Sequence, residues 1–539
     1  MTLSEAIVLV CCTGATIVSL LRWLRVAQRE HYLTRSVAVF VYRWWSKSPS
    51  EIAAFVLGAA GACLSIAYPV AALATAGAVG FFPTHLSVRG RSSKLVWTRR
   101  LKTLAGCAAM TCGLPIALCA LLGGLHPAMT ASAFVALATP LLVALGLVLC
   151  APLEELLAQR HVNRAKERVA RIHPTIVGIT GSYGKTSTKG YLEHLVAGRF
   201  RVVASPRSFN NRAGLARAVN EDLIEGTDVF IAEMGAYVPG EIAALCAWLK
   251  PKIAVICAIG PVHLDRFKTL ERTLQAKAEI VEHAEVVVLN VDDARLSGLV
   301  SGLSQLGRRV IACSGSDRDA DVFVRLAGRD VELFVDSVRI GQVTLKSENQ
   351  AIAATNIACA IGAALALGCE APEVLARLRG LPVAQNRLEV LLATNGAVVL
   401  DDTFNANPSG ARWALEELAS LGRTGGRRVV VSPGMVELGD RQAEENAEFA
   451  KSAARVATDF VIVGRTNRRA LRRGINESAR AVAPPRDSEA LHGGQSPGQS
   501  DPLYVAEVRT REQAVAYVRK FLQRDDVVLY ENDLPDHYF

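Results

Sequence analysis

Several patterns that mark particular protein classes are missing from this chain of 539 residues. Its twelve cysteines include no Cys-x-x-Cys pair, so no zinc or disulfide framework is indicated, and this usage suits a reducing compartment. The sequence contains no internal repeat, which excludes a repeat array. No basic residue precedes the first apolar run, whereas Arg22 and Arg25 follow it, which argues against a cleaved signal peptide.

Charged residues are also nearly absent from four apolar runs near the front of the chain. The runs are Ala6–Leu21, Ile52–Phe82, Leu104–Leu125 and Ala128–Ala151. Each approaches or exceeds the length of about 20 residues that spans a bilayer. A buried core helix is the alternative for any single run. Four runs in succession instead predict an α-helical membrane segment over residues 1–152, with four or five crossings.

Positive charge is concentrated in the connections between these runs. The connections 22–50 and 83–103 are rich in Arg and Lys, but the short joint near His126 carries no full charge. Both basic connections are therefore predicted to be cytoplasmic, so residues 52–82 enter and return as a hairpin, and everything after residue 152 lies inside the cell.

The same charge distribution decides which partners the chain favours. Residues 1–172 contain 17 Lys and Arg against 6 Asp and Glu, whereas the remaining chain contains 43 against 45. The formal net charge of +9 thus belongs to the membrane segment, where it matches anionic lipid. We expect a lipid bilayer as a partner and no nucleic acid.

A glycine turn lies between an apolar run and a helical pattern. Thr175–Thr180 is predicted as a buried strand, and Lys185–Val196 as a helix whose N-terminal amide groups face the turn. Such a turn binds phosphates through backbone amides and Lys185, with the hydroxyl of Thr186 available to Mg²⁺. Ile179 stands where the P-loop pattern begins with glycine, so a fortuitous glycine-rich turn is the alternative. The strand and helix around the turn favour nucleotide binding.

The rest of the chain divides into three parts. Residues 153–172 form a charged helical stretch that leads out of the membrane segment. Residues 173–387 and 388–539 are each predicted as an α/β domain, and the first has a parallel sheet. Residues 483–502 are rich in Pro, Gly, Ser and Gln and are expected to form a disordered loop. The strands that we expect are Asp228–Glu233, Ile253–Ile259, Val286–Asn290, Ala397–Leu400, Arg428–Val431, Phe460–Val463 and Val527–Tyr530.

Polar residues follow the strands of the first α/β domain at the edge where open α/β sheets bind ligands. Glu233 ends one strand, His263 follows the next, and Asp292 and Asp293 follow a third. Each alone has an ordinary explanation as a loop or turn residue, and Lys277 by default is a solvated lysine. Together with the phosphate loop they suggest Mg²⁺–nucleotide chemistry.

The motifs of this region resemble those of the Mur ligase family in order and spacing. They are Thr180–Ser187, Asn210-Asn211, Glu233–Gly235, Ala258–Asp265, Ala276–Glu279 and Leu289–Asp293. Leu400–Ser409 and Gly434–Gly439 resemble the branch that adds D-alanyl-D-alanine to the UDP-N-acetylmuramoyl-tripeptide. The resemblance covers about residues 173–535 and implies a P-loop ATPase-type sheet followed by a Rossmann-like C-terminal domain.

The resemblance implies an ATP-dependent amide ligase that activates a carboxylate as an acyl phosphate. Lys185, His263 and Lys277 would be catalytic. Thr186 and Glu233 would hold one Mg²⁺, and His263 and a carbamylated Lys277 the second. The residues that would bind ATP are Gly181, Ser182, Gly184, Lys185, Thr186, Ser187, Asn356 and Arg387. Those that would contact the substrate are Asn210, Asn211, Asp402, Asn405 and Asn407, the last three from the C-terminal domain, so catalysis would require domain closure.

Three stretches depart from the family pattern. Lys346–Ala351 lacks the Gly-x-His-Asn that precedes the helix of Asn356, and Asn386 replaces a glycine, which weakens the expected adenine contacts. Tyr530–Asp536 replaces a Lys-Gly-Ser-Arg-like loop, and its acidic residues would suit a cationic group in the incoming amine better than a free carboxylate. At the front of the chain, the predicted membrane helices also stand where this branch of the family normally has a soluble domain that binds the UDP-sugar.

Three functions stay open from the sequence. The first is a ligase acting on a cell-envelope peptide precursor, which is held in soluble UDP-linked form by other surfaces or is lipid-linked. The second is a ligase of poly-γ-glutamate or another capsule polymer, against which the motif Asp401–Ser409 argues. The third is a non-catalytic membrane scaffold, which the retention of Lys185, Glu233 and Lys277 makes unattractive.

The topology can be tested with reporter fusions in the intact chain. A reporter fused after Arg171 should be cytoplasmic, and one inserted beside His126 should be external, because basic connections stay inside. Phosphatase and fluorescence reporters measure the two locations. An external reporter after Arg171 would contradict ATP-dependent chemistry in the domains that follow.

Overall fold

The computed structural model describes residues 3–30, 32–46, 49–83, 86, 88, 95–206, 209–346, 353–382, 388–403, 407–423, 425–478, 481–482 and 503–532. These residues divide into two compact units, one up to Gln159 and the other from Arg160 onward. The loop predicted at 483–502 lies outside the described residues.

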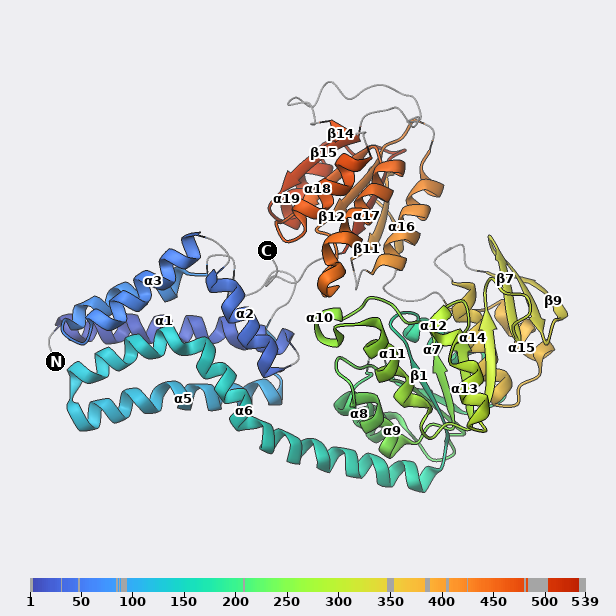
Figure 1. The fold of residues 1–539 in the computed structure, drawn as a ribbon, viewed down its shortest axis with the longest axis horizontal. Coiled ribbons are helices and arrows are strands. Elements are labelled where there is room, and N and C mark those ends of the chain that lie inside the picture. The colour runs from blue at the N-terminus through green and yellow to red at the C-terminus, as the bar shows by residue number, and fades with distance from the viewer. Residues whose placement is uncertain are drawn as a thin grey trace. The chain divides into compact units, whose positions relative to one another are not determined.

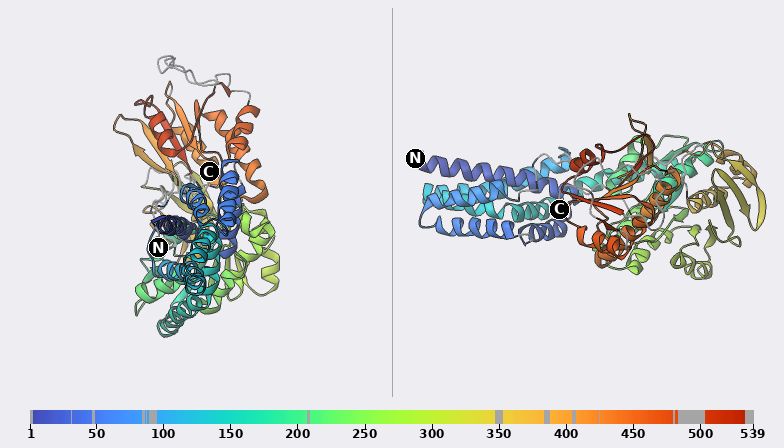
Figure 2. Two further views of the ribbon diagram at one scale, coloured as in Figure 1. Left: turned by 90° about the vertical axis from the view of Figure 1, so that its left-hand side faces the viewer. Right: turned by 90° about the horizontal axis from the view of Figure 1, so that it is seen from above.

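The first unit consists of helices, and three helices of the described chain are long and apolar enough to cross a membrane. These are α1 (Leu3–Arg29), α5 (Arg99–Gly123) and α6 (Leu125–Ile172). The shorter ones are α2 (Thr34–Ser46), α3 (Pro49–Leu64), η1 (Pro69–Ala71) and α4 (Ala72–Phe81). In Figures 1 and 2 the helices run side by side, and α3 and α4 pack together where a hairpin is expected. The crossing of a bilayer stays a prediction.

Close helix contacts and apolar side chains hold this unit together. Trp23 of α1 is buried against Leu101 of α5 and Val143 of α6. A Cβ atom at Gly61 of α3 would lie 2.8 Å from the hydroxyl of Thr75 in α4, so glycine permits the two helices to approach. Large apolar side chains are exposed on α5, including Met110, Leu114, Leu121 and Leu122. Such a surface is typical of contact with lipid or protein rather than with water.

The middle domain contains a nine-stranded sheet in the order β2-β3-β1-β4-β5-β6-β7-β8-β9. Its strands are β1 (Thr175–Thr180), β2 (Val202–Ala204), β3 (Val229–Glu233), β4 (Ile253–Ile256), β5 (Val286–Asn290), β6 (Arg309–Ser314), β7 (Val322–Ala327), β8 (Asp330–Val335) and β9 (Val338–Thr344). Neighbours from β2 to β7 are parallel, as predicted. The antiparallel strands β7, β8 and β9 were not among the predictions. Two-residue turns join them, and Asp336 and Ser337 have the positive φ angles of a hairpin turn.

Helices cover both faces of this sheet because successive strand residues point to opposite sides. Val177 and Ile179 of β1 pack under α7 (Lys185–Val196), α14 (Ala354–Ala366) and α15 (Ala371–Leu378). Ile176 faces the other core, which also buries Val162 and Ala165 at the end of α6. The elements on that side are α8 (Arg212–Asp222), α9 (Glu241–Leu249), α10 (Leu264–Phe267), α11 (Leu270–Ala278), η2 (Glu279–Val281), α12 (Ala294–Ser297) and α13 (Val300–Gln305).

The C-terminal domain contains a seven-stranded sheet in the order β10-β11-β16-β12-β13-β15-β14. The strands are β10 (Glu389–Leu392), β11 (Val398–Asp402), β12 (Arg428–Ser432), β13 (Asp459–Val463), β14 (Ala481–Val482), β15 (Leu503–Val508) and β16 (Val527–Glu531). The strands β11, β12, β13 and β16 confirm the four predicted for this domain. Among the described strands of this sheet, only β10 pairs antiparallel with its neighbour. The helices are α16 (Pro408–Leu421), η3 (Gly439–Arg441), α17 (Gln442–Val456), α18 (Arg468–Glu477) and α19 (Arg511–Val518). Helices α16, α17 and α18 lie over one face of the sheet, and α19 lies over the other.

All twelve cysteines are free thiols. Five of them belong to the two α/β domains, and all five are buried, namely Cys246, Cys257, Cys313, Cys359 and Cys369. Burial raises the pKa of Cys246 to about 12 and also raises that of Cys257 and of Cys369. These side chains act as small apolar residues of the core.

Candidate functional site

The glycine turn after β1 leads directly into the N-terminus of α7. Gly181 and Gly184 have φ angles of 154° and 79°, which a side chain would disfavour. A Cβ atom at Gly184 would also overlap the side-chain oxygen of Asn356, so the turn passes close to the start of α14. No side chain caps α7, which leaves its first amide groups directed at the turn. This arrangement can receive an anion.

Side chains of the turn are fixed by hydrogen bonds to the surrounding loops. The ammonium group of Lys185 donates to the carbonyl of Gly181 at 2.7 Å. The hydroxyl of Ser182 accepts from the amide of Gly260 at 3.0 Å and donates to its carbonyl at 3.2 Å. Ser187 is buried inside α7. The predicted phosphate-binding residues therefore lie together around one preformed turn.

Glu233 is the centre of a buried polar cluster beside this turn. Its side chain is 1% exposed and accepts hydrogen bonds from three residues. The donors are Thr186 at 3.0 Å, Lys189 at 3.0 Å and Asn210 at 3.1 Å. Lys189 is itself 5% exposed and donates to the carbonyl of Ser205 at 2.8 Å. A buried carboxylate needs a counter-charge, and Lys189 supplies it to Glu233.

A cavity brings the phosphate turn together with the other predicted catalytic residues. Lys185, Asn210, His263, Phe267 and Lys277 all line it. Lys277 is 4% exposed, and burial, followed by the nearby charge of Lys185, lowers its pKa to about 7. The ordinary alternative of a solvated lysine at this position is therefore excluded, because the side chain is buried and lines the cavity.

His263 stands at the end of this cavity in a left-handed conformation, with φ of 55°. Its ring packs edge-on against Tyr237, with ring centroids 4.7 Å apart. Its Nδ1 atom forms a short hydrogen bond with the carboxylate of Glu437, which belongs to the motif Gly434–Gly439 of the C-terminal domain. A histidine held by a carboxylate has a fixed tautomer and orientation, which suits a metal ligand.

The remaining predicted residues have more varied surroundings. Asn211 and Asn407 cap α8 and α16, each accepting from a backbone amide at 2.9 Å. Asp402 ends β11 and accepts from the amide of Leu388 at 3.2 Å. Asn405 and Arg387 lie outside the described residues. Helix capping explains Asn211 and Asn407 without a substrate.

The two aspartates after β5 also have local partners. Asp292 accepts from the hydroxyl groups of Ser314, Ser316 and Thr355 and from the amide of Gly315. Asp293 caps α12 and accepts from the amide of Ile259 at 2.9 Å. Both therefore brace the loops around the nucleotide edge of the sheet. The described residues contain no cluster of three His, Cys, Asp or Glu side chains arranged for a metal.

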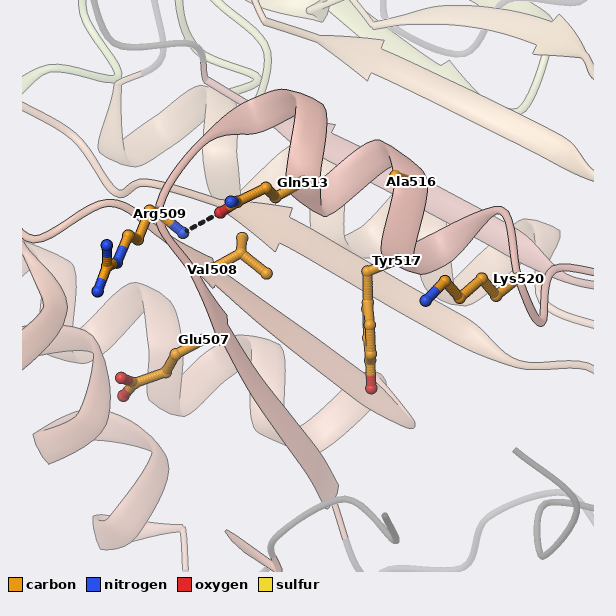
Figure 3. A pocket seen from close by; sticks show the side chains of 7 residues that line it. All are labelled: Glu507, Val508, Arg509, Gln513, Ala516, Tyr517 and Lys520. Atoms are coloured by element: carbon orange, nitrogen blue, oxygen red, sulfur yellow. Dashed lines mark hydrogen bonds between the residues drawn. The ribbon is translucent and has the colours of Figure 1, made fainter. Parts of the chain in front are cut away.

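A second hollow lies on the C-terminal domain, between the end of β15 and α19 (Figure 3). Glu507, Arg509, Tyr517 and Lys520 line it, and the side chain of Gln513 accepts from the amide of Arg509 at 2.9 Å. No predicted site residue that the structure describes is among the lining residues. The cavity at the phosphate turn is thus the candidate active site.

Comparison with known proteins agrees with this site. Residues 179–366 match the Mur ligase middle domain, and residues 386–530 match the Mur ligase, glutamate ligase domain. The chain is 32% identical over 385 residues to the UDP-N-acetylmuramoyl-tripeptide–D-alanyl-D-alanine ligase of Mycobacterium leprae, which covers 66% of this chain and 70% of that protein. The chain belongs to the Mur ligase family. It is an ATP-dependent, ADP-forming ligase of an acid and an amine.

Further relatives place this Mur ligase near one branch. The ligase of the same name from Mycobacterium tuberculosis strain H37Rv is 31% identical over 380 residues, covering 66% of this chain and 69% of the relative. Among solved structures, MurF from Acinetobacter baumannii has a TM-score of 0.57 at 21% identity, covering 70% of this chain and 77% of its own. MurF from Thermotoga maritima in complex with ADP has a TM-score of 0.55 at 24% identity, covering 70% and 80%. At these identities the structures show a shared fold.

Three residues of the site were not among those predicted from the sequence. Lys189, one turn beyond Lys185, supplies the counter-charge of Glu233. Glu437 lies inside a motif that was recognised, but its contact with His263 joins residues 174 positions apart. Tyr183 has a buried hydroxyl group that none of the described residues hydrogen-bonds, and its ring packs where a side chain at Gly260 would lie. Only Lys189 had a local signal, its helical spacing from Lys185.

Replacement of Lys185 by alanine tests the phosphate turn. Lys185→Ala removes the cation that faces the turn, and loss of one such electrostatic contact costs roughly 10²–10³ in rate. Release of ADP and product by the purified chain measures it. The matched control is Lys252→Ala, which removes an exposed lysine that pairs with Glu285 beside β4. Activity of Lys185→Ala within a few-fold of the parent would contradict a role in phosphate binding.

Proposed function

We propose that this Mur ligase is a membrane-anchored enzyme that activates a carboxylate of a cell-envelope peptide precursor as an acyl phosphate and joins it to an amino acid or dipeptide. The observation that carries the proposal is the single cavity in which Lys185, His263 and Lys277 meet beside Glu233. The names of the relatives add the substrate class, because they join D-alanyl-D-alanine to UDP-N-acetylmuramoyl-tripeptide.

The residues of the cavity fit the two groups that this reaction needs. The amides of α7, with Gly181, Ser182, Gly184 and Lys185, would hold the phosphates of ATP. Thr186 and Glu233 share a hydrogen bond and together offer the oxygen ligands that Mg²⁺ prefers. Bound Mg²⁺ would neutralise the phosphates. Lys185 would then stabilise the charge that develops as the phosphoryl group moves to the substrate carboxylate, and Asn356 and Arg387 would contact the nucleotide.

Lys277 fits the proposed carbamate because it is buried and forms no ion pair with a carboxylate among the described residues. A pKa of about 7 leaves much of the side chain as a neutral amine at neutral pH. A neutral amine attacks CO₂, forms a C–N bond and releases a proton, so the neutral side chain becomes an anionic carbamate. The carbamate would, together with His263, offer ligands for a second Mg²⁺, and it would relieve the repulsion between Lys277 and Lys185.

The proposal extends to the organisation of the chain. We assign residues 1–152 to the membrane segment, 153–172 to the connecting helix, 173–387 to the ATP-binding domain and 388–539 to the C-terminal domain. The last two lie in the cytoplasm, where ATP is found. Asn210, Asp402, Asn405 and Asn407 would face the substrate, and Asn211 would support Asn210 from the helix cap.

The mass of the product tests the proposed function. The purified full chain is incubated with ATP, Mg²⁺ and matched soluble UDP-linked and lipid-linked peptide precursors, each with and without an amino acid or dipeptide. We expect an amide product and one ADP for each bond. Ligation of glutamate into a polymer in place of these products would favour a capsule polymer ligase. Binding of a precursor without consumption of ATP or formation of product would indicate a non-catalytic scaffold.

Replacement of Lys277 by alanine tests the carbamate. Lys277→Ala should be nearly inactive while still folded, since it removes an anionic ligand of the metal. Added acetate or formate should restore part of the turnover, because a small carboxylate can enter the vacated space. Neither acid should restore Lys185→Ala, which is the matched control. Full activity of folded Lys277→Ala, or failure of both acids to rescue it, would contradict the carbamate.

A further inference from the structure

Helix α18 of the C-terminal domain has one buried side and one strongly basic side. Leu471, Gly474 and Ile475 are buried on the first side. A Cβ atom at Gly474 would overlap the carbonyl oxygen of Ala447 in α17, so glycine lets these two helices pack closely. The helical period of 3.6 residues places the arginines of α18 on the opposite side, which faces solvent. They are Arg468, Arg469, Arg472 and Arg473.

Two hollows with basic linings flank one edge of the C-terminal sheet. Strands β15 and β14 end the sheet, and α18 covers one of its faces beside this edge while α19 covers the other. One hollow lies on α18, and the other, shown in Figure 3, lies between β15 and α19. Arg472 of the first hollow pairs with Glu507 of the second, so the two hollows adjoin. Five cations line them, which together we call the basic face: Arg469, Arg472, Arg473, Arg509 and Lys520.

The acids beside the basic face do not neutralise it. Two carboxylates, Glu477 and Glu507, line the same hollows as the five cations. Glu507 already pairs with both Arg468 and Arg472, and Glu477 lies 3.8 Å from Arg473. The side chains of Arg472 and Arg473 are still 62% and 53% exposed. Because the two α/β domains together contain 43 basic against 45 acidic residues, this surplus of positive charge is local.

The chemistry of the basic face favours phosphate groups spread over a surface. Four of its five cations are arginines, whose guanidinium groups bind phosphate through paired N–H donors. The cations are divided between two hollows instead of converging on one point, which suits a partner that presents many phosphates. The aromatic lining residue, Tyr517, is half-buried and packs against Phe521 with ring centroids 5.4 Å apart, unlike the exposed rings on which nucleic-acid bases stack. Lipid headgroups fit this pattern better than a nucleic acid.

We propose that the basic face binds the phosphate headgroups of an anionic lipid bilayer. The proposal goes beyond the ligase reaction, and it rests on the proposed membrane anchoring, which keeps a bilayer within reach of the domain. Each arginine or lysine near an anionic membrane surface strengthens binding about five-fold, so several cations act together without a deep pocket. Salt screens such exposed charges, and the interaction therefore weakens as ionic strength rises.

Hydrogen–deuterium exchange of the full chain in lipid nanodiscs tests the basic face. One set of discs contains phosphatidylcholine alone, and the other contains phosphatidylcholine with phosphatidylglycerol. We expect the amides of α18 and α19 to exchange about five-fold more slowly in the anionic discs, which corresponds to the binding gained from one cation. The difference should disappear at high salt. Mass spectrometry of peptides from each domain measures it, with the middle domain as the internal reference.

Charge removal shows whether the arginines cause this protection. The triple variant Arg469→Gln, Arg472→Gln and Arg473→Gln should lose most of the difference between the two kinds of disc. The matched control is Arg423→Gln, Arg455→Gln and Arg524→Gln, which removes the same charge from exposed positions beside the starts of β12, β13 and β16. This control should retain the full difference. If the first triple variant fails to fold, the salt dependence of the parent chain decides.

The outcomes separate the basic face from the membrane anchoring and from the ligase reaction. Entry into both kinds of disc with equal exchange of α18 and α19 overturns the basic face and leaves the other two proposals intact. Failure to enter neutral discs contradicts the anchoring, and flotation of the full chain with anionic vesicles then decides, since absence of flotation overturns the basic face. Protection by polyuridylate RNA in place of anionic lipid would assign this surface to nucleic acid and also overturn the proposal.

Discussion

The buried ion pair between Glu233 and Lys189 is the interaction on which the rest of the nucleotide edge depends. The strand of Glu233, β3, lies between β2 and β1 in the parallel part of the sheet, and its carboxylate is buried. Lys189 and Asn210 hold it from two sides, and Thr186 connects it to the phosphate turn. Because Thr186 lies on the first turn of α7 and Lys189 on the second, the same helix that would receive the phosphates also positions the acid proposed to bind the metal.

The cavity beside this acid is lined by two lysines whose surroundings differ. The side chain of Lys185 donates to a carbonyl of the phosphate turn. Lys277 is deeper, and burial pushes it toward the neutral amine. One site therefore gives two identical side chains different roles, chiefly through burial and then through the charge of one acting on the other.

Local patterns in the sequence predicted the parts of the fold that are locally determined. The strand before the phosphate turn, the helix after it and the parallel strands β3, β4 and β5 follow from apolar runs and glycine spacing. The hairpins of β7, β8 and β9 were not predicted because their alternating, partly exposed strands lack long apolar runs. The burial of Lys277 and the contact of His263 with Glu437 depend on segments brought together by folding. No single-sequence pattern encodes such contacts.

The buried thiols of the two α/β domains have a practical consequence for labelling. Maleimide and disulfide reagents attack the thiolate, and the raised pKa of Cys246, Cys257 and Cys369, with their burial, keeps them protonated and out of reach. A cysteine introduced on the surface of either domain would then be the reactive thiol there. Pairs of such cysteines could carry dyes that report the distance between the domains during turnover, without removal of any native cysteine from the ligase core.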